Sequence, residues 1–318
     1  MNELDKAKDL LNNFSYDDEN SFNENNDIRS FVSNLIKTNE CATIAVKYEN
    51  TCAIVTAIYP TVRKVHHFNS VSKDEYEDFC KSLEIDPDEY ANCSRTNNIC
   101  GVRTRVFAIT KPFSATPIIT ISTTKNPPAM LNKQTISDDE WDKIVHSNFI
   151  VIGQSGSGKT YLMNYLLHKF IKDYERVALI EEFGEIIPPN ENTVSMIVPP
   201  PKPGEESKLR FLTEQSNLMR LDAFYVGEIK GAEAWPFVVN LASGTRGGAT
   251  IHGTDARQAL QRLRSLCQLS CNNDEAIDEM ISKSIQYIIV MKNKNIESIQ
   301  ELTTSHIRGN FSMREIYS

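Results

Sequence analysis

Short apolar runs punctuate the second half of the chain, and segments with a helical repeat lie between them. A strand buried on both faces loses its polar alternation, so each apolar run predicts such a strand. Strands separated by helices favour a doubly wound, largely parallel sheet. The predicted strands are Phe149–Ile152, Val177–Ile180, Phe224–Val226, Ala249–Ile251 and Ile285–Met291.

Alternating patterns in the first part of the chain predict a smaller α+β unit. An amphipathic helix is expected at Ile28–Ile36, and a capping-box pattern begins a further helix at Ser72. The same pattern at Ser137 begins a short helix after the expected domain boundary. Helices beside several antiparallel strands are typical of an α+β domain. The predicted strands of this part are Thr43–Tyr48, Cys52–Ile58, Val102–Ile109 and Ile118–Ser122, with a hairpin turn at Asn50.

Turn-forming residues mark the expected domain boundary. The segment Thr123–Lys133 contains two adjacent prolines, so we expect an N-terminal α+β domain over residues 1–130 and an α/β domain over residues 131–318. Before the first domain we expect a short helix at Asp5–Phe14 and a solvated linker at Tyr16–Asp27. Near the carboxyl terminus, Gly309-Asn310 lies between two alternating stretches and predicts a hairpin.

The sequence directly after Phe149–Ile152 is rich in glycine. It reads Gly-Gln-Ser-Gly-Ser-Gly-Lys-Thr and fits the pattern G-x-x-x-x-G-K-[ST] of a phosphate-binding loop. Glycines let such a loop turn its N–H groups toward a phosphate, and the following helix adds the positive end of its dipole. We expect Lys159 to reach the phosphates and Thr160 to ligate Mg2+. The predicted nucleotide-binding residues are Gly153, Gln154, Ser155, Gly156, Ser157, Gly158, Lys159, Thr160 and Tyr161.

Acidic residues follow two later strands, and a nucleotide hydrolase needs such residues near the phosphates. Glu181, Glu182 and Glu185 follow one predicted strand, and Glu228 follows the next. The first three either serve catalysis or form a solvated acidic turn, and their spacing leaves both interpretations open. A stretch of small residues ends at His252, which is either a γ-phosphate sensor or a structural histidine.

Composition narrows the functional classes. The chain has 318 residues and a formal net charge of −8, which argues against broad nucleic-acid binding through a basic surface. No apolar run approaches the length of a membrane span and the amino terminus lacks a signal-peptide pattern, so we expect a cytosolic protein without a transmembrane segment. The 7 cysteines match no metal-site spacing and are expected to be reduced thiols.

The order of these motifs resembles that of the secretion and pilus traffic ATPases, which are the hexameric motors of type II secretion, type IV secretion and type IV pili. The resemblance covers about Phe149–Leu269 and is densest at Gly227–Ala234, which is similar to the Walker B segment of the family. Glu181–Glu185 looks like the Asp box of the family, and Thr250–His252 looks like its His box. The pilus-assembly and type IV secretion branches are the most similar.

The resemblance implies roles for individual residues. It makes Glu185 the general base, and it makes Glu228 the Walker B carboxylate beside magnesium. His252 matches the histidine that closes the His box. Arg220 matches an arginine that resembles a charge stabiliser at the phosphates. These four residues, with the phosphate-binding loop, form the candidate active site of the α/β domain.

The sequence also departs from the family pattern. Lys230 replaces the usual arginine, and a lysine is a point charge that cannot make the same two-pronged contact. Thr245 stands where the His box usually opens with histidine. The N-terminal domain matches loosely: in the family it can contribute arginines to the nucleotide site, and Arg103 and Arg105, on one face of a predicted strand, are the candidates here. An equal interpretation makes both of them solvent-facing strand residues.

Together, the motifs and the resemblance predict a RecA-like P-loop domain with a smaller N-terminal α+β domain, and ATP between them. The expected function is an ATP-hydrolysing motor, with ATP and Mg2+ as ligands, that serves secretion, conjugation or a type IV pilus. The resemblance implies a homo-hexamer at the inner face of the cell membrane, an inner-membrane platform protein as partner and no direct nucleic-acid contact. The alternatives are a RecA-like nucleic-acid motor and a non-hydrolysing, nucleotide-dependent assembly subunit.

Overall fold

The computed structural model describes residues 27–38, 43–58, 63–85, 93–109, 116–123, 136–198, 207–307 and 310–317. The predicted helix at Asp5–Phe14 and nearly all of the predicted linker and boundary segments lie outside these ranges. The chain divides into two compact units, Met1–Lys125 and Asn126–Ser318. The domain limits at residues 130 and 131 stay a prediction. Within the described ranges, no helix is long and apolar enough to cross a bilayer.

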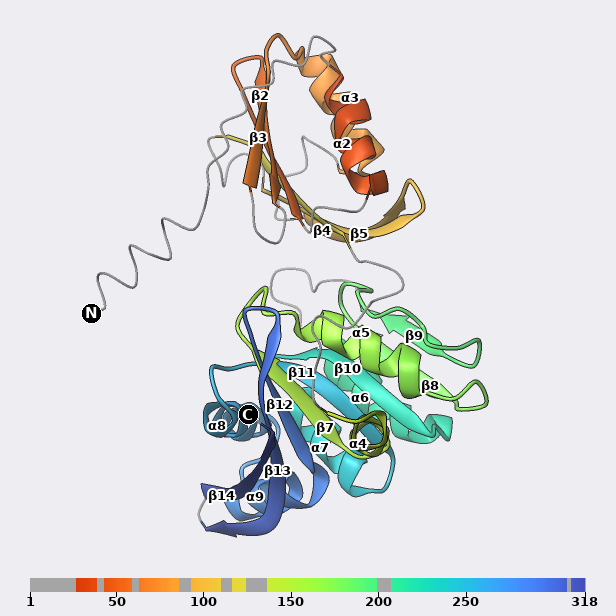
Figure 1. Ribbon diagram of the computed structural model, residues 1–318, viewed down its shortest axis with the longest axis vertical. Helices are drawn as coiled ribbons and strands as arrows, with labels where there is room; N and C mark the ends of the chain where they lie inside the picture. The colour runs from red at the N-terminus through yellow and green to blue at the C-terminus, as the bar shows by residue number, and fades with distance from the viewer. Residues whose placement is uncertain are drawn as a thin grey trace, which may run out of the picture. The chain divides into compact units, whose positions relative to one another are not determined.

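The first unit is a six-stranded antiparallel sheet with the helices α2 and α3 packed on one face (Figure 1). The strand order is β3-β2-β1-β6-β5-β4. Apolar residues of both helices form one core with the buried positions of the strands, which confirms the predicted α+β unit. The elements are α2 (Ile28–Thr38), β1 (Thr43–Glu49), β2 (Cys52–Ile58), β3 (Arg63–Phe68), α3 (Lys73–Ser82), β4 (Cys93–Ile99), β5 (Val102–Ile109) and β6 (Ile118–Thr123).

Local sequence signals fix the ends of several elements. Ser72 begins α3 with a complete capping box, because the Glu75 N–H donates to Ser72 Oγ (3.2 Å) and the Ser72 N–H donates to Glu75 Oε2 (2.7 Å). Ser137 begins the helix Asp138–Val145 with the same pair of bonds. The hairpin between β1 and β2 turns at Asn50, whose φ of 51° is typical of a tight two-residue turn. All three predictions are confirmed.

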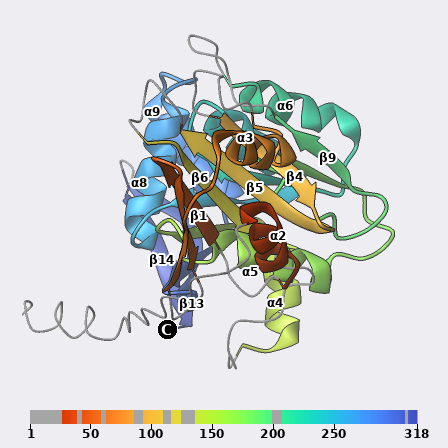
Figure 2. The ribbon, with the colours of Figure 1, turned by 90° about the horizontal axis from the view of Figure 1, so that it is seen from above.

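The second unit is an eight-stranded mixed sheet in the order β14-β13-β12-β7-β11-β10-β8-β9. The strands from β12 to β9 are parallel, and β13 and β14 form an antiparallel hairpin, as predicted. Helices α4 and α5 cover one face and α6 to α9 cover the other, with α8 and α9 side by side (Figure 2). The predicted doubly wound, largely parallel sheet is therefore confirmed. The elements are α4 (Asp138–Val145), β7 (Phe149–Gly153), α5 (Lys159–Phe170), β8 (Val177–Glu181), β9 (Val194–Ile197), α6 (Leu209–Ser216), the 3-10 helix η1 (Asn217–Met219), β10 (Ala223–Ile229), α7 (Ala234–Ala242), β11 (Arg246–His252), α8 (Ala256–Cys267), α9 (Asp274–Ser284), β12 (Tyr287–Lys292), β13 (Asn295–Ile307) and β14 (Asn310–Tyr317).

Sequence patterns did not predict β3, β4 or β9, and each of these strands lies at the edge of its sheet. An edge strand buries less side-chain surface than a central one, so it carries a weaker apolar pattern. In β3 the first residues, Arg63 and Lys64, are exposed, and in β9 half-buried and exposed positions alternate. Charged and polar edges also discourage pairing with other chains.

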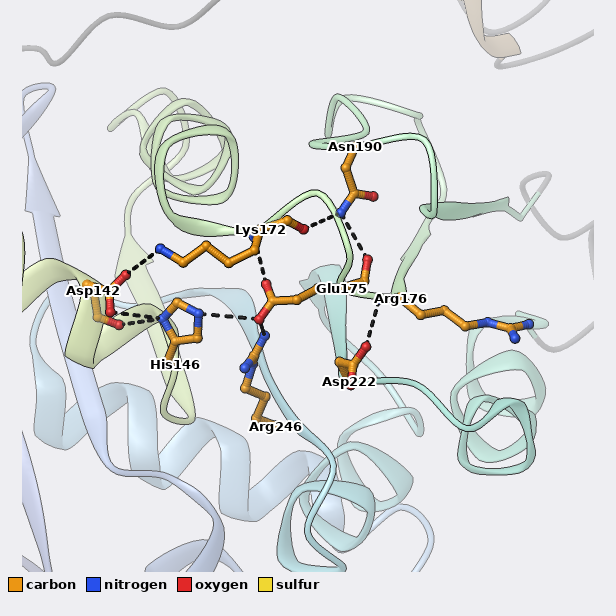
Figure 3. Close-up of polar contacts among 8 residues, drawn as sticks. All are labelled: Asp142, His146, Lys172, Glu175, Arg176, Asn190, Asp222 and Arg246. Carbon is orange, nitrogen blue, oxygen red and sulfur yellow. Dashed lines mark hydrogen bonds and ion pairs between the residues drawn. The ribbon is translucent and has the colours of Figure 1, made fainter.

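A buried carboxylate joins several segments at the amino ends of the strands (Figure 3). Glu175, just before β8, is 4% exposed. Arg246 Nη2 donates to Glu175 Oε1 (2.5 Å), the Lys172 N–H donates to Glu175 Oε2 (2.9 Å), and His146 Nε2 lies 3.4 Å from Glu175 Oε1. Burial raises the pKa of Glu175, but the hydrogen bonds and charges of these partners outweigh it, so the pKa lies below its ordinary value.

Neighbouring hydrogen bonds extend this cluster (Figure 3). The Asn190 amide donates to the carbonyls of Lys172 (2.8 Å) and Glu175 (2.9 Å). The Arg176 N–H donates to Asp222 Oδ2 (2.8 Å), which ties the start of β8 to the segment before β10. The cluster therefore links the amino ends of β8, β10 and β11, three neighbouring strands in the parallel part of the sheet.

We expect Glu175→Gln to weaken the fold at neutral pH and to lose this effect in acid. The lowered pKa means that ionised Glu175 stabilises the fold above the ordinary glutamate pKa of about 4.3. That contribution is lost as the pH falls through this value toward the lower pKa of the folded state. Urea unfolding should show a loss of about 1–3 kcal/mol at pH 7 and a smaller loss at pH 3.5.

Glu214→Gln is the matched control, because Glu214 forms an exposed ion pair with Arg210 on α6. Its effect on the free energy of unfolding should stay below about 0.5 kcal/mol at either pH. An equal loss for Glu175→Gln at both pH values would show that its charge is not what stabilises the cluster.

Candidate phosphate-binding site

The glycine-rich stretch forms a loop between β7 and α5, where the sequence predicts it. Gly156 and Gly158 have φ values of 73° and 96°, which glycine adopts without steric cost. Gly158 is the N-cap of α5 and makes no side-chain cap, so the first N–H groups of the helix can face an anion. A Cβ on Gly153 would lie 2.6 Å from the Met291 carbonyl oxygen, which belongs to the backbone of β12, so this position also needs glycine.

Lys159 folds back over the loop. Its Nζ donates to the carbonyls of Gly153 and Gln154, both at 3.0 Å, and the residue is 8% exposed. An ammonium group has three donors, so one is left for a phosphate oxygen. Burial lowers the pKa of Lys159, while the charges of Glu228 and Glu185 oppose this shift.

A cavity of about 380 Å³ opens beside the loop, a size within the range of ligand pockets. Its lining comes from residues 154–157 of the loop, from Gly253 and Thr254 after β11, and from residues 291–293 before β13. The Lys294 N–H donates to the Ser157 carbonyl (3.1 Å), which fixes the turn after β12 to the loop. Within the described part of the chain, the buried Ser157 hydroxyl has no hydrogen-bond partner, so it can donate to an anion.

Parallel pairing brings the carboxyl ends of four strands to one edge of the sheet. Gly153 at the end of β7 pairs with His252 at the end of β11, and β11 pairs with β10, which carries Glu228 near its end. Next to β10 lies β8, and the loop after β8 brings Glu185 Oε2 to 3.4 Å from Thr160 Oγ1. The structure thus gathers Glu185, Glu228 and His252 at the same edge as the phosphate-binding loop.

The acids at the end of β8 and in the loop after it occupy three different environments. Glu181 is 4% exposed and accepts the N–H groups of Glu185 (2.7 Å) and Ile186 (3.1 Å). The Glu182 side chain is 6% exposed and forms an ion pair with Lys230. A solvated acidic turn does not describe these two side chains. Glu185 is the acid of this set whose carboxylate contacts Thr160, so it stays the candidate base.

Lys230, the replacement for the usual arginine, connects the ends of β10 and β8. Besides its ion pair with Glu182, its Nζ lies 5.6 Å from the centroid of the Phe183 ring. The backbone beside it is held as well, because buried Glu233 accepts the N–H groups of Lys230 (2.6 Å) and Gly231 (2.8 Å). A single charge therefore replaces a two-pronged contact but keeps the two loops linked.

His252 contacts a second site residue, because its Nε2 lies 2.6 Å from Glu228 Oε1. Thr250 reinforces the same edge by donating its hydroxyl to the Gly227 carbonyl (2.6 Å). The small residues that open β11 have a packing reason: a Cβ on Gly247 would lie 2.0 Å from a backbone oxygen of β10. They serve the close approach of strands at the opposite edge from His252.

Arg220 does not lie with the other candidates in this chain, and its predicted role as a charge stabiliser stays a prediction. It is exposed, has a φ of 52° and precedes the amino end of β10, whereas Glu228 lies toward the carboxyl end. The strand between them spans roughly 20 Å at the usual rise per residue. Sequence proximity to a motif could not reveal that the strand carries Arg220 to the opposite edge of the sheet.

The remaining candidates have known positions but untested roles. Tyr161 is half-buried in the first turn of α5. Arg103 and Arg105 are half-buried on one face of β5 in the first unit, and the intervening Thr104 is buried on the other face. Their contribution to a nucleotide site stays a prediction.

Sequence reasoning missed Asn164, a residue of α5 that is 2% exposed. Its amide hydrogen-bonds the backbone on both sides of Ile186, in the loop after β8. One signal could have revealed it: an amide in a stretch whose neighbouring positions, such as Leu162 and Leu166, are buried and apolar. A polar group buried among apolar ones needs a specific partner.

Comparison with known proteins places these features in a family. Residues 130–310 match the family model described as type II/IV secretion system protein. The chain is 31% identical to the type IV secretion system protein VirB11 of Bartonella quintana over 174 residues, which are 54% of this chain and 46% of the relative. It is 31% identical to PtlH of Bordetella pertussis over 153 residues, which are 46% of this chain and 45% of PtlH. The chain thus spans about half the length of the curated relatives it matches.

Solved structures share the fold. The ATPase DotB of Legionella pneumophila superposes with a TM-score of 0.59 at 16% identity, covering 90% of this chain and 80% of DotB. The pilus retraction motor PilT, solved with bound ADP, superposes with a TM-score of 0.57 at 15% identity, covering 91% of this chain and 81% of PilT. At these identities the likeness establishes the mixed α/β fold alone, with its antiparallel N-terminal sheet.

We expect Lys230→Met to destabilise the second unit, because it leaves the buried Glu182 carboxylate without its cation. The loss in the free energy of unfolding should be about 1–3 kcal/mol in urea at pH 7. Lys283→Met is the control: Lys283 and its partner Glu279 have side chains 60% and 49% exposed, so that loss should stay below about 0.5 kcal/mol. Equal losses for both variants would contradict the structural role of the Lys230–Glu182 pair.

Proposed function

The chain belongs to the family of type II/IV secretion system proteins, and from this premise we propose that it is an ATP-hydrolysing motor. One observation carries the proposal: Lys159 and Thr160 lie at the same edge of the sheet as two carboxylates, Glu185 and Glu228. Phosphoryl transfer to water needs such a set, in which a loop and a lysine hold the phosphates and acids orient metal and water. The names of VirB11 and PtlH support secretion as the work performed.

The triphosphate binds along the loop 153–160, with the helix N–H groups and Lys159 directed at its oxygens. Three features support this placement: the uncapped start of α5, the unused donor of Lys159 and the unpaired hydroxyl of Ser157 in the described chain. The cavity that borders the loop lies beside this triphosphate position and offers space for the rest of the nucleotide. Tyr161, Arg103 and Arg105 stay candidates for its outer contacts.

Thr160 and Glu228 are the residues that would hold Mg2+, because hydroxyl and carboxylate oxygens are ligands that this ion prefers. When bound, Mg2+ neutralises negative charge on the phosphate oxygens. Glu185 orients the attacking water and accepts its proton. Lys159 stabilises the charge that develops on the phosphate oxygens in a site of low dielectric constant. His252 holds Glu228 from the side of β11.

The proposal extends to assembly and location. We assign a homo-hexameric ring at the inner face of the cell membrane, with an inner-membrane secretion or pilus platform protein as partner, and motion between the two units as the output of hydrolysis. This part of the proposal is supported by family membership. The matched segments cover about half of the curated relatives. Analytical ultracentrifugation with ATP tests the ring, because a protein that stays monomeric with saturating nucleotide would not be a ring motor.

We expect Lys159→Ala to abolish nucleotide binding, because it removes the cation that neutralises the phosphates. ATP turnover should fall by about 100-fold or more, measured as phosphate release by the purified protein. Lys169→Ala on the same helix is the control, since Lys169 forms an ion pair with Asp138 that is partly exposed, and it should turn over ATP like the parent. A Lys159→Ala protein that hydrolyses ATP as fast as the parent would rule out this enzymatic function.

We expect Glu185→Gln to separate binding from chemistry. Glutamine keeps the size of the side chain but cannot accept a proton, so turnover should fall by about 100-fold or more while a fluorescent ATP analogue still binds. The variant Glu214→Gln on α6 controls for loss of a surface charge. Unchanged turnover in Glu185→Gln would move the role of base to another acid, with Glu228 as the next candidate.

A further inference from the structure

The loop that carries Glu185 has no regular secondary structure, yet side chains bind its backbone at four successive points. Gly184, with a φ of 60°, turns the chain after β8. The N–H groups of Glu185 and Ile186 then donate to Glu181, and the Glu185 carbonyl and the Ile187 N–H bond to Asn164. A loop whose polar groups are paired in this way has one preferred conformation.

Asn164 connects this loop to the phosphate-binding helix. Its Nδ2 donates to the Glu185 carbonyl (2.9 Å), and its Oδ1 accepts the Ile187 N–H (2.7 Å). The residue is 2% exposed, so water does not compete for these bonds. Breaking them would leave buried backbone groups without partners, which is costly.

Asn164 and Thr160 lie four residues apart on α5, so both project from the same face of the helix. Thr160 contacts the Glu185 carboxylate (3.4 Å), and Asn164 holds the Glu185 backbone. Helix α5 therefore contacts both the side chain and the main chain of Glu185. Since α5 begins in the phosphate-binding loop, these contacts set the position of Glu185 relative to that loop.

We propose that Asn164 is a positioning residue for Glu185: it holds the carboxylate at a fixed distance from the nucleotide without touching the nucleotide itself. Glu181 supports the same loop from the end of β8, because its buried carboxylate accepts the N–H groups of Glu185 and Ile186. This inference rests on the proposed ATPase function. A catalytic group displaced by about 1 Å can lose roughly 100-fold in rate, so the position of Glu185 has a measurable consequence.

The test compares Asn164→Ala with the parent under saturating ATP. Turnover should fall by about 10-fold to 100-fold while the affinity for a fluorescent ATP analogue stays like that of the parent, since the phosphate-binding loop is intact. Asn164→Asp provides a second variant of nearly the same size. It keeps the acceptor for Ile187 but turns an oxygen toward the Glu185 carbonyl, so its turnover should fall as well.

The matched control is Asn240→Ala. Asn240 is also a buried helical amide, 4% exposed, but it donates to Thr213 and Ser216 at the packing of α7 on α6. It should cost stability without changing turnover by the folded protein. Unfolding in urea and turnover measured on the same preparations separate these two effects.

The double variant Asn164→Ala with Glu185→Gln distinguishes positioning from a general structural role. If Asn164 acts through Glu185, the double variant turns over ATP no more slowly than Glu185→Gln alone. Three outcomes would each overturn the inference. Turnover could be unchanged in both Asn164 variants, or Asn164→Ala could change turnover no more than Asn240→Ala does. The third outcome is a double variant that turns over ATP more slowly than Glu185→Gln alone. A parent protein that does not hydrolyse ATP would overturn the proposed function and this inference with it.

Discussion

Parallel pairing of β7, β11, β10 and β8 is the constraint on which the candidate site depends. Neighbouring strands that run in the same direction end at the same edge of a sheet, so groups far apart in the chain meet there. Glycine at the start of β11 permits the close approach of its neighbours, and helices on both faces bury the strands. The phosphate-binding loop, Glu185, Glu228 and His252 come together because of this arrangement.

The charged groups at this edge differ in their electrostatic partners. Lys159 is a buried cation that donates to two loop carbonyls. Burial lowers its pKa, and the charges of Glu228 and Glu185 oppose only part of that shift. Glu181 accepts backbone N–H groups, and Glu182 forms an ion pair with Lys230. Glu185 instead contacts Thr160 on the helix that follows the phosphate-binding loop. Acids that look alike in the sequence thus differ by their partners, and that difference decides which of them can act on water.

Local patterns were sufficient for much of the fold and part of the site. The glycine-rich loop, both capping boxes and the central strands are encoded by residues close together in sequence, and these predictions are confirmed. Glu185 and Glu228 were predicted as site residues because each follows a buried strand and matches a motif of the family, and their roles stay a prediction. The position of Arg220 before the amino end of β10 was not predicted, because a motif does not show at which end of a strand its residues lie. Asn164 was missed because its partners, Glu185 and Ile187, lie in another segment of the chain. The edge strands β3, β4 and β9 were missed because an edge strand carries a weaker apolar pattern than a central one.

The Glu175 cluster lies where the central strands begin, and the phosphate-binding loop lies where they end. Resistance to heat or acid can therefore be adjusted at one side of the domain with the chemistry of the other side left intact. Homologues adapted to different temperatures are expected to vary more around Glu175 than around Lys159. Substitutions meant to raise the stability of the protein are therefore best made at the amino ends of β8, β10 and β11.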